Sequence, residues 1–372
     1  MSTTLHKREV QPKSNSQNHA GESADKGSSN NTVTEMVGDL SVALESAIGE
    51  IHSVNSETKV LALNARIEAA RAGTYGAAFS VVAEEMQNLS DKTSHIANEM
   101  ASRTRDKTAE LMSMIDSTIR GTRLSDLALT NIDLIDRNLY ERTCDVRWWA
   151  TDSSLVDGLS DPNEKSLRYA SKRLGVILDA YTVYHDLLLC DASGRVVANG
   201  RPDQFRCVGE NLSKADWFTN AIASRSGDEY GFDPPHASAV MQNRPTAVYS
   251  CGVREHGDAR GDILGALGIF FNWQGLAQPI LDNIPVPVQE QAVTQAYIIS
   301  REGKILASNQ DRALGENLRI SEMQRVFKSA KGFYVADDKD QRWCIGHAHA
   351  PGFETYTTDW YSIVMQPLSH TS

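Results

Sequence analysis

One part of this 372-residue chain combines aromatic rings with acidic groups in a way that could bind a small molecule. Aromatic faces attract cations and carboxylates pair with them, so such a set suits a neutral or cationic ligand, for instance an amine. For any single ring, packing in a hydrophobic core is the more common explanation. The residues that we predict to line a binding pocket are Tyr184, Trp217, Phe218, Tyr230, Asp233, Tyr249 and Phe270.

Catalytic and metal-binding patterns have little support in the sequence. His347 and His349 are two apart, so both rings would point to one side of a strand, but no third metal ligand is indicated. The chain has no HExxH, P-loop, GxSxG or GxGxxG motif. Its five cysteines are widely spaced without a CxxC pattern, which indicates reduced thiols. We therefore expect no enzyme, no cofactor and no metal site.

Charge and hydropathy bound the class of protein further. A net charge of −11 argues against binding to nucleic acid or to an anionic membrane surface, since both require a basic patch. No segment reaches the ~20 apolar residues of a membrane span, and the N-terminus lacks the apolar core of a secretory signal. We expect a cytoplasmic protein with no direct membrane span, which a partner could recruit to membrane receptor arrays. Residues 1–31 are rich in Ser, Asn, Lys and Gly, which predicts a disordered tail.

Residues 32–140 have the apolar spacing of long helices. Two runs alternate in steps of four and three, the pattern of a coiled coil, and the small-residue turn at 71–76 between them is short enough to require antiparallel arms. We predict an all-α antiparallel coiled-coil hairpin. The second arm outlasts the first, so it must pack on another subunit or lead into the next domain. The predicted seam is Val33, Val37, Leu40, Leu44, Ala47, Ile51, Val54, Thr58 and Leu61, then Phe79, Val82, Met86, Leu89, Thr93, Ile96 and Met100.

The tip of this hairpin, residues 57–89, contains LALN at 61–64, IEAARAG at 67–73 and VVAE at 81–84. This run resembles the signalling tip of bacterial methyl-accepting chemotaxis proteins, the chemoreceptors. The resemblance implies a homodimer or higher receptor oligomer that contacts a chemotaxis histidine kinase and a coupling protein. The residues that it assigns to these contacts are Val60, Leu61, Asn64, Glu68 and Arg71.

Two positions near the tip depart from the chemoreceptor pattern. Ser56 stands where family members usually have an aromatic residue, and Lys59 stands where they have Asn. Losing an aromatic ring removes a large contact between receptors. The arms are also too short to hold the methylated glutamates of the family, so we do not expect adaptation by methylation.

The C-terminal part changes to strand patterns that occur twice. The segment at 185–200 reads as strand, turn and strand, and the segment at 295–308 repeats this design. Further strands are predicted at 244–254, 262–273, 333–336, 343–347 and 360–366. Pro285 and Pro287 mark a boundary. This repeat resembles an α+β double Cache sensor on a long helix, with a membrane-distal-type first module at 141–285 and a second at 286–372; a PAS-like pair is the alternative.

Amino-acid-binding Cache domains pair an arginine, two positions before a tryptophan–aromatic pair, with an aspartate on a later strand. Here Ala215 and Phe270 stand at those positions, so an α-amino acid held in that way is not expected. The predicted function is a soluble chemoreceptor-like signal transducer. A small molecule bound by the first module would displace a helix at 144–159 and so signal to the tip. The alternative is a non-signalling interaction protein that joins or modulates receptor arrays with a degenerate sensor.

Overall fold

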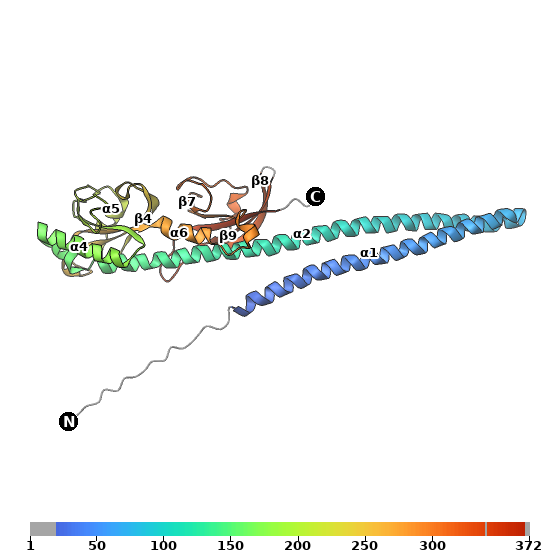
Figure 1. The fold of residues 1–372 in the computed structure, drawn as a ribbon, viewed down its shortest axis with the longest axis horizontal. Helices are drawn as coiled ribbons and strands as arrows, with labels where there is room; N and C mark the ends of the chain where they lie inside the picture. Colours follow the sequence, from blue (N-terminus) through green and yellow to red (C-terminus); the bar gives the residue numbers. More distant parts are fainter. Residues whose placement is uncertain (1–19, 339–340, 369–372) are drawn as a thin grey trace, which may run out of the picture. The chain divides into compact units, whose positions relative to one another are not determined.

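The computed structural model describes residues 20–338 and 341–368, with side chains from residue 35 onward, and divides the chain into two compact units that meet between Ile119 and Arg120. The first unit is a helical hairpin. Helix α1 (Ala20–Arg71) leads through a short 3₁₀ turn, η1 (Gly73–Gly76), into α2 (Ala77–Trp149), which continues into the second unit (Figure 1). The antiparallel hairpin and its turn are as the sequence predicts.

Helix α1 begins earlier than the sequence predicts. The disordered tail was expected to reach residue 31, but the helix starts at Ala20, and residues 1–19 lie outside the described part. The composition argument concerns how much apolar surface a segment can bury. It does not apply to a helix that is already nucleated, because each further residue then adds a hydrogen bond at little cost.

Two glycines shape the tip. Gly73 has a φ of +58°, a left-handed conformation that glycine adopts without strain. A Cβ atom on Gly76 would lie 2.1 Å from the carbonyl oxygen of Ala69, so only glycine permits the two arms to meet this closely. The sequence therefore specifies the turn through backbone geometry rather than through side-chain contacts.

The arms of the hairpin contact each other through small residues, which corrects the predicted seam. The residues buried between the arms recur at every seventh position: Ile48, Asn55, Ala62, Ala69, Gly76, Ala83, Ser90 and Ala97. Large residues of the predicted seam face outward instead; Val54, Leu61 and Leu89 are 64%, 62% and 65% exposed. Periodicity identified the apolar stripe correctly but could not tell which surface the stripe meets.

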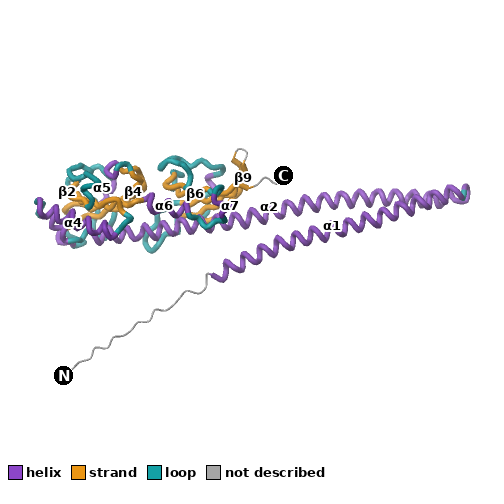
Figure 2. Tube along the Cα trace, in the orientation of Figure 1, coloured by secondary structure: helices purple, strands orange, loops and turns teal. Residues whose placement is uncertain are grey.

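The second unit, residues 120–372, holds two five-stranded antiparallel sheets of identical topology. The first has the order β2-β1-β5-β4-β3 and the second the order β7-β6-β10-β9-β8, so the predicted internal repeat is present. Figure 2 shows the strands in two separate groups. Their strands are β1 (Tyr184–Asp191), β2 (Val196–Asn199), β3 (Gly231–Ser238), β4 (Arg244–Arg254), β5 (Ile263–Asn272), β6 (Gln295–Ile299), β7 (Ile305–Ser308), β8 (Lys331–Asp338), β9 (Gln341–His349) and β10 (Tyr361–Leu368).

Helices connect and cover these sheets. The predicted division at residue 285 falls between the sheets, after α6. The sequence predicts one helix at 144–159. The structure has two helices there: α2 ends at Trp149, and α3 begins after Asp152, whose carboxylate caps it by accepting a hydrogen bond from the Ser154 amide. The helices are α3 (Ser153–Ser160), α4 (Glu164–Ala180), α5 (Asp216–Ile222), α6 (Trp273–Asp282) and α7 (Val288–Gln291), with 3₁₀ turns η2 (Ala239–Met241), η3 (Glu255–Gly257) and η4 (Met323–Arg325).

Strand β3 was not predicted from the sequence. It contains Pro234 and Pro235, which lack the amide hydrogens of a regular ladder. The structure accommodates them at the sheet edge, where β3 pairs only with β4, and the register shifts between Asp233 and His236. Prolines are tolerated at edges and bulges for this reason.

The end of α2 belongs to the second unit. From Leu124 to Val146 its inward side chains share one hydrophobic core with α3, α4 and one face of each sheet. Gly121 and Gly346 allow close packing here, since a Cβ on them would strike the Phe333 ring and the backbone at Leu124. The hairpin boundary predicted at residue 140 is therefore too late. A continuous helix gives no break in the sequence pattern when the partner of its apolar face changes.

Candidate functional site

The predicted tip residues lie together on α1, on its last turns before η1. Val60, Leu61, Asn64, Glu68 and Arg71 are all exposed. Glu68 and Arg71 are joined by an ion pair of 2.8 Å, and both side chains are about two-thirds or more exposed, so water screens the pair and it adds little to stability. These side chains are consequently available to a partner.

A buried polar cluster that the sequence reading missed sets the pairing of the two arms. The amide of Asn55 donates to the Ser90 carbonyl at 2.7 Å and to the Ser94 hydroxyl at 2.6 Å. The Ser90 hydroxyl in turn donates to the Asn55 amide oxygen at 2.8 Å. A slip of one turn would leave these buried groups without partners, so they fix the register. The sequence signal for this cluster was available: Asn55 and Ser90 are polar residues in a series of otherwise small residues that recurs at every seventh position.

The predicted ligand residues separate onto the two faces of the first sheet. Trp217 and Phe218 of α5 and Phe270 of β5 pack in one apolar cluster, with ring centroids 5.9 Å and 5.7 Å apart in edge-to-face pairs. Asp233 faces the same side, because it lies opposite Val248 of that cluster. Burial raises the pKa of the Asp233 carboxyl, and the His236 ring lies 3.8 Å from it. We call this side the α5 face.

The other predicted residues, Tyr184, Tyr230 and Tyr249, lie on the opposite side of the sheet, in the core shared with α2. The Tyr184 hydroxyl donates to Asp145 of α2 at 2.5 Å. The Tyr249 hydroxyl is 2.7 Å from the hydroxyl of Tyr356, which belongs to the second module. These rings therefore connect the first sheet to the helix and to the second module rather than lining one pocket with Trp217.

Buried charge strengthens the attachment of the first sheet to α2. Arg142 of α2 is almost fully buried, lies 3.3 Å from the Asp145 carboxylate, and stacks over the rings of Tyr184 and Phe271. Burial raises the pKa of Asp145 above its usual value, although the Tyr184 hydroxyl and Arg142 oppose that shift. A movement of β1 would have to carry this part of α2 with it, because breaking a buried pair is costly.

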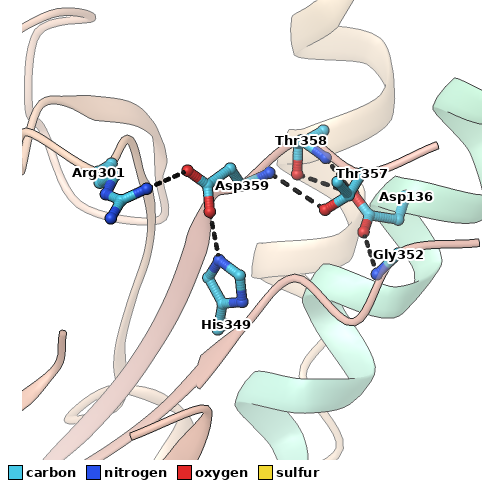
Figure 3. Close-up of polar contacts among 7 residues, drawn as sticks. All are labelled: Asp136, Arg301, His349, Gly352, Thr357, Thr358 and Asp359. Carbon is cyan, nitrogen blue, oxygen red and sulfur yellow. Dashed lines mark hydrogen bonds and ion pairs between the residues drawn. The ribbon is translucent and has the colours of Figure 1, made fainter. Parts of the chain in front are cut away.

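The second module is attached to α2 through a carboxylate that is fully buried (Figure 3). Asp136 accepts hydrogen bonds from the Gly352 amide at 2.9 Å and from the Thr358 hydroxyl at 2.7 Å. The next residue of that loop, Asp359, is held by the His349 ring at 2.7 Å and by Arg301 at 3.0 Å. The loop between β9 and β10 is thus tied at one point to the end of β9 and at another to the helix.

Asp136 was not singled out from the sequence. The signal that could have found it is its place inside an apolar helical stripe, between Ile132, Ile135 and Leu139, all fully buried. A carboxylate within such a stripe needs hydrogen-bond donors from another element. Burial raises the pKa of Asp136, and the bonds from Thr358 and Gly352 act against this.

The two histidines considered for a metal site have different surroundings. His347 is buried beside Tyr334, and burial lowers the pKa of its ring. The His349 ring instead forms a hydrogen bond with the Asp359 carboxylate. Within residues 20–338 and 341–368, no group of three acidic, histidine or cysteine side chains could hold a metal ion. The helices of those same ranges include none with the length and apolar character needed to span a bilayer.

Two family models match the chain. The model described as the methyl-accepting chemotaxis protein signalling domain matches residues 12–135, and the model described as the Cache domain matches residues 77–372. Both resemblances expected from the sequence are thereby confirmed. The overlap of the two matches lies on α2, the helix that both structural units share.

Curated methyl-accepting chemotaxis proteins match part of the chain. The methyl-accepting chemotaxis protein CtpM of Pseudomonas aeruginosa is 44% identical over 80 residues, which are 22% of this chain and 12% of that protein. PcaY of Pseudomonas putida, also a methyl-accepting chemotaxis protein, is 34% identical over 123 residues, 32% of this chain and 20% of that protein. The chain thus matches less than a quarter of the length of these relatives.

Solved chemoreceptor ligand-binding domains also match part of the chain. The ligand-binding domain of the Campylobacter jejuni chemoreceptor Tlp3, in complex with L-valine, superposes with a TM-score of 0.50 and 13% identity. The match covers 67% of this chain and 92% of that domain. At this identity the similarity shows that the two share a fold.

Proposed function

The chain belongs to the Cache domain family and carries a chemoreceptor signalling domain, and from this premise we propose that it is a signal transducer controlled by a small molecule. Binding to the sensor unit would change the position or stability of α2, and the hairpin would pass this change to a chemotaxis histidine kinase and its coupling protein. A ligand can do so only if its affinity differs between two states of the helix.

The observation that carries this proposal is that one helix serves both units. Its first part forms an arm of the hairpin, and its last part is held in the sensor unit by buried Asp136 and partly buried Asp145. A rigid helix is a physical connection along which a displacement can be transmitted. Contacts from both modules converge on it, so either could influence it.

We assign the kinase and coupling-protein contacts to Val60, Leu61, Asn64, Glu68 and Arg71. Support comes from their exposure on one end of α1 and from their place in the matched signalling domain. Val60 and Leu61 expose apolar surface beside polar Asn64, the mixture typical of a protein contact.

We further propose that the hairpin pairs with a second copy of itself. Its outward stripe contains large apolar side chains that the single chain leaves in water. A cavity of about 590 Å³ lies along this stripe, lined by Ile51, Val54, Asn55, Leu89 and neighbouring side chains. A second hairpin would fill it and bury the stripe, giving a four-helix bundle with large residues at its centre. The receptor oligomer expected from the sequence would begin with this dimer.

The ligand is proposed to bind on the α5 face, near Trp217, Phe218, Asp233 and Phe270. Aromatic rings and one carboxylate suit a neutral or cationic amine. Tyr184, Tyr230 and Tyr249 would then act from the opposite face by relaying the change to α2. We place the protein in the cytoplasm, where a partner could recruit it to receptor arrays. In support, none of its five cysteines forms a disulfide bond.

A reconstituted kinase assay tests the signalling proposal. The full chain is added to a chemotaxis histidine kinase and coupling protein, and kinase phosphorylation and co-sedimentation are measured. We expect the chain to bind and to change the phosphorylation rate, and Asn64→Ala or Arg71→Ala to weaken both effects. Asp39→Ala, an exposed acid on the same helix, is the matched control. A wild-type chain that neither binds nor alters the rate would refute the proposal.

One observation favours the alternative, a protein that joins or modulates receptor arrays with a degenerate sensor. On the α5 face, Trp217, Phe218 and Phe270 are 3%, 4% and 1% exposed and pack on one another, which leaves the rings little surface for a ligand. The same assay separates the two functions when a panel of amines is added. Binding to the kinase with no response to any amine, together with no amine binding to the chain, would support the alternative.

A further inference from the structure

A second cavity, away from the α5 face, lies where the end of α2 meets the first module. Its volume is about 340 Å³. Its walls come from three parts of the chain: the last turn of α2, the loop before β3, and the end of β4 with the loop that follows it. The lining side chains include Cys144, Arg147, Trp148, Asp228, Cys251 and Arg254.

Arg254 at the end of β4 carries a buried charge without an acidic partner. It is only 8% exposed. Its guanidinium donates to the carbonyls of Gly261 at 3.0 Å and Ser224 at 2.5 Å, both neutral. Its Nε is buried and has no hydrogen-bond partner. A buried guanidinium is expected to meet a compensating negative charge, whereas the hydrogen bonds of Arg254 in the described part of the chain all go to neutral groups, the Ser224 hydroxyl at 3.1 Å included.

Arg147 of α2 brings a second positive charge to the same cavity. Its Nε donates to the Thr143 carbonyl at 2.8 Å, and its guanidinium stacks on the Tyr230 ring. Within the described ranges it too forms no ion pair; its contact with Asp228 goes to the backbone carbonyl, at 3.5 Å. Two guanidiniums therefore line one cavity without a carboxylate bound to either.

Other polar groups at the cavity do not neutralise these charges. Asp228 and Asp258 also line the cavity, but both residues are exposed to water, and within the described ranges neither carboxylate forms an ion pair with Arg147 or Arg254. Burial raises the pKa of the Cys251 thiol to about 11, so this group is neutral at physiological pH. At the end of α2, the carbonyls of Val146, Trp148 and Trp149 accept hydrogen bonds from the three amides that follow the helix.

We propose that this cavity binds a small organic anion whose carboxylate or phosphate group lies between Arg147 and Arg254. Guanidinium groups bind both oxoanions through paired, charge-assisted hydrogen bonds. Trp148, which is 72% exposed at the rim, offers an apolar surface to the rest of the molecule. The bound anion would join α2 to β4 directly. This site differs in place and in charge preference from the amine site proposed on the α5 face.

Anion binding to the full chain tests the proposal without reference to signalling. Succinate, benzoate and inorganic phosphate are titrated by calorimetry at constant ionic strength, and ethylammonium chloride serves as the cationic control. Cys144 supplies a second readout, because it is the exposed cysteine and lines the cavity. A bound anion should slow its alkylation by iodoacetamide. Preference for the carboxylates or for phosphate identifies the oxoanion.

Arg147→Gln should weaken binding by about tenfold to a hundredfold, the effect of losing a charged hydrogen bond. Arg254→Gln should weaken anion binding to a similar extent. If the Arg254→Gln protein does not fold, because the residue is buried, the Arg147→Gln result alone tests the proposal. Arg260→Gln is the matched control, since it removes an exposed charge from the adjacent loop and should leave the affinity within about twofold. The proposal is overturned if no anion binds saturably at millimolar concentration, or if Arg147→Gln binds as the wild type does.

Discussion

The hairpin and the sensor unit use their large apolar side chains in opposite ways. In the hairpin, small residues such as Ala62 and Ala83 are buried between the arms, and Leu61 and Leu89 are exposed. In the sensor unit, α2 buries Leu124, Ile132 and Leu139 completely. The same helix contributes to both arrangements. The sensor unit can therefore fold as a single chain, whereas the hairpin has its main apolar surface still to bury.

This difference indicates what kind of binding event could change the structure of each unit. A closed core holds α2 in place and responds to a ligand only through repacking. A hairpin whose stability depends on a partner responds to the concentration and arrangement of that partner. All six tryptophans lie between residues 148 and 360, so tryptophan fluorescence reports the sensor unit alone, and the two units can be followed separately in one sample.

The largest expected effect is loss of the hairpin dimer in Leu89→Glu. Each buried leucine is worth about 1.5–3 kcal/mol, so the two copies in a dimer should lose about 3–6 kcal/mol together. Sedimentation equilibrium measures the change. Val42→Glu is the control, because Val42 is exposed but lies outside the predicted seam. If both variants dimerise like the wild type, the outward stripe is not the dimer contact and the comparison between the units fails.

A substitution on the other part of the same helix should act on the sensor unit alone. Ile132→Ala leaves a cavity in a closed core and should lower the free energy of unfolding by about 2–5 kcal/mol. Leu134→Ala, two positions away and 48% exposed, should change it by less than about 0.5 kcal/mol. Urea titration followed by tryptophan fluorescence measures both. Similar losses in the two variants would mean that this face of α2 is not buried selectively.

The polar cluster in the hairpin should contribute less. Asn55→Ala removes the side-chain amide that bonds Ser90 and Ser94, leaves the buried Ser90 hydroxyl only the Asn55 backbone carbonyl at 3.1 Å, and should cost about 1–3 kcal/mol of hairpin stability. In Asn55→Ala with Ser90→Ala, both partners are gone, so the combined loss should be smaller than the sum of the single losses. Thermal unfolding followed by helical circular dichroism gives the values. Strict additivity would show that the two side chains do not act as a pair.

The smallest expected effect is a pH dependence in the sensor unit. Asp186 is fully buried and accepts bonds from Asn199 and from three backbone amides, yet burial raises its pKa above 3.8. The folded state therefore keeps the proton to higher pH than the unfolded state does. The stabilisation of the fold by the protonated Asp186 carboxyl is fully present below pH 3.8 and is lost as the pH rises through the folded-state pKa.

Asp186→Asn removes this titration. Relative to the variant, the wild type should lose stability as the pH rises from below 3.8 through the raised pKa of Asp186. Urea midpoints by tryptophan fluorescence across this range supply the comparison. Parallel curves for the two proteins would contradict the expectation, and a wild type that gains stability relative to the variant would reverse its sign.

Much of the architecture was open to prediction because it follows from local patterns. Heptad spacing and the glycine turn indicated the hairpin, and the repeated strand–turn–strand segments indicated the two modules. Prediction failed where a local rule met a tertiary exception. Strand β3 was not predicted because Pro234 and Pro235 argue against a strand, and only the position of β3 at the sheet edge lets it contain them. The sequence shows the chemical types of the candidate ligand residues. It does not show which face of the sheet each one lies on, because that depends on how the strands pair.

The sequence by itself determined that this chain has a helical hairpin and a duplicated α+β sensor, since both follow from residue spacing and local turns, and the residue run at the tip resembles that of chemoreceptors. Only the tertiary structure decided which surface each apolar stripe meets, which rings share a face, and that Asp136 and Arg254 are buried. The physical reason is that periodicity defines a face of a helix or strand, whereas the partner of that face comes from segments distant in the sequence. Tyr249 and Tyr356 meet across 107 positions, and no local pattern encodes that contact.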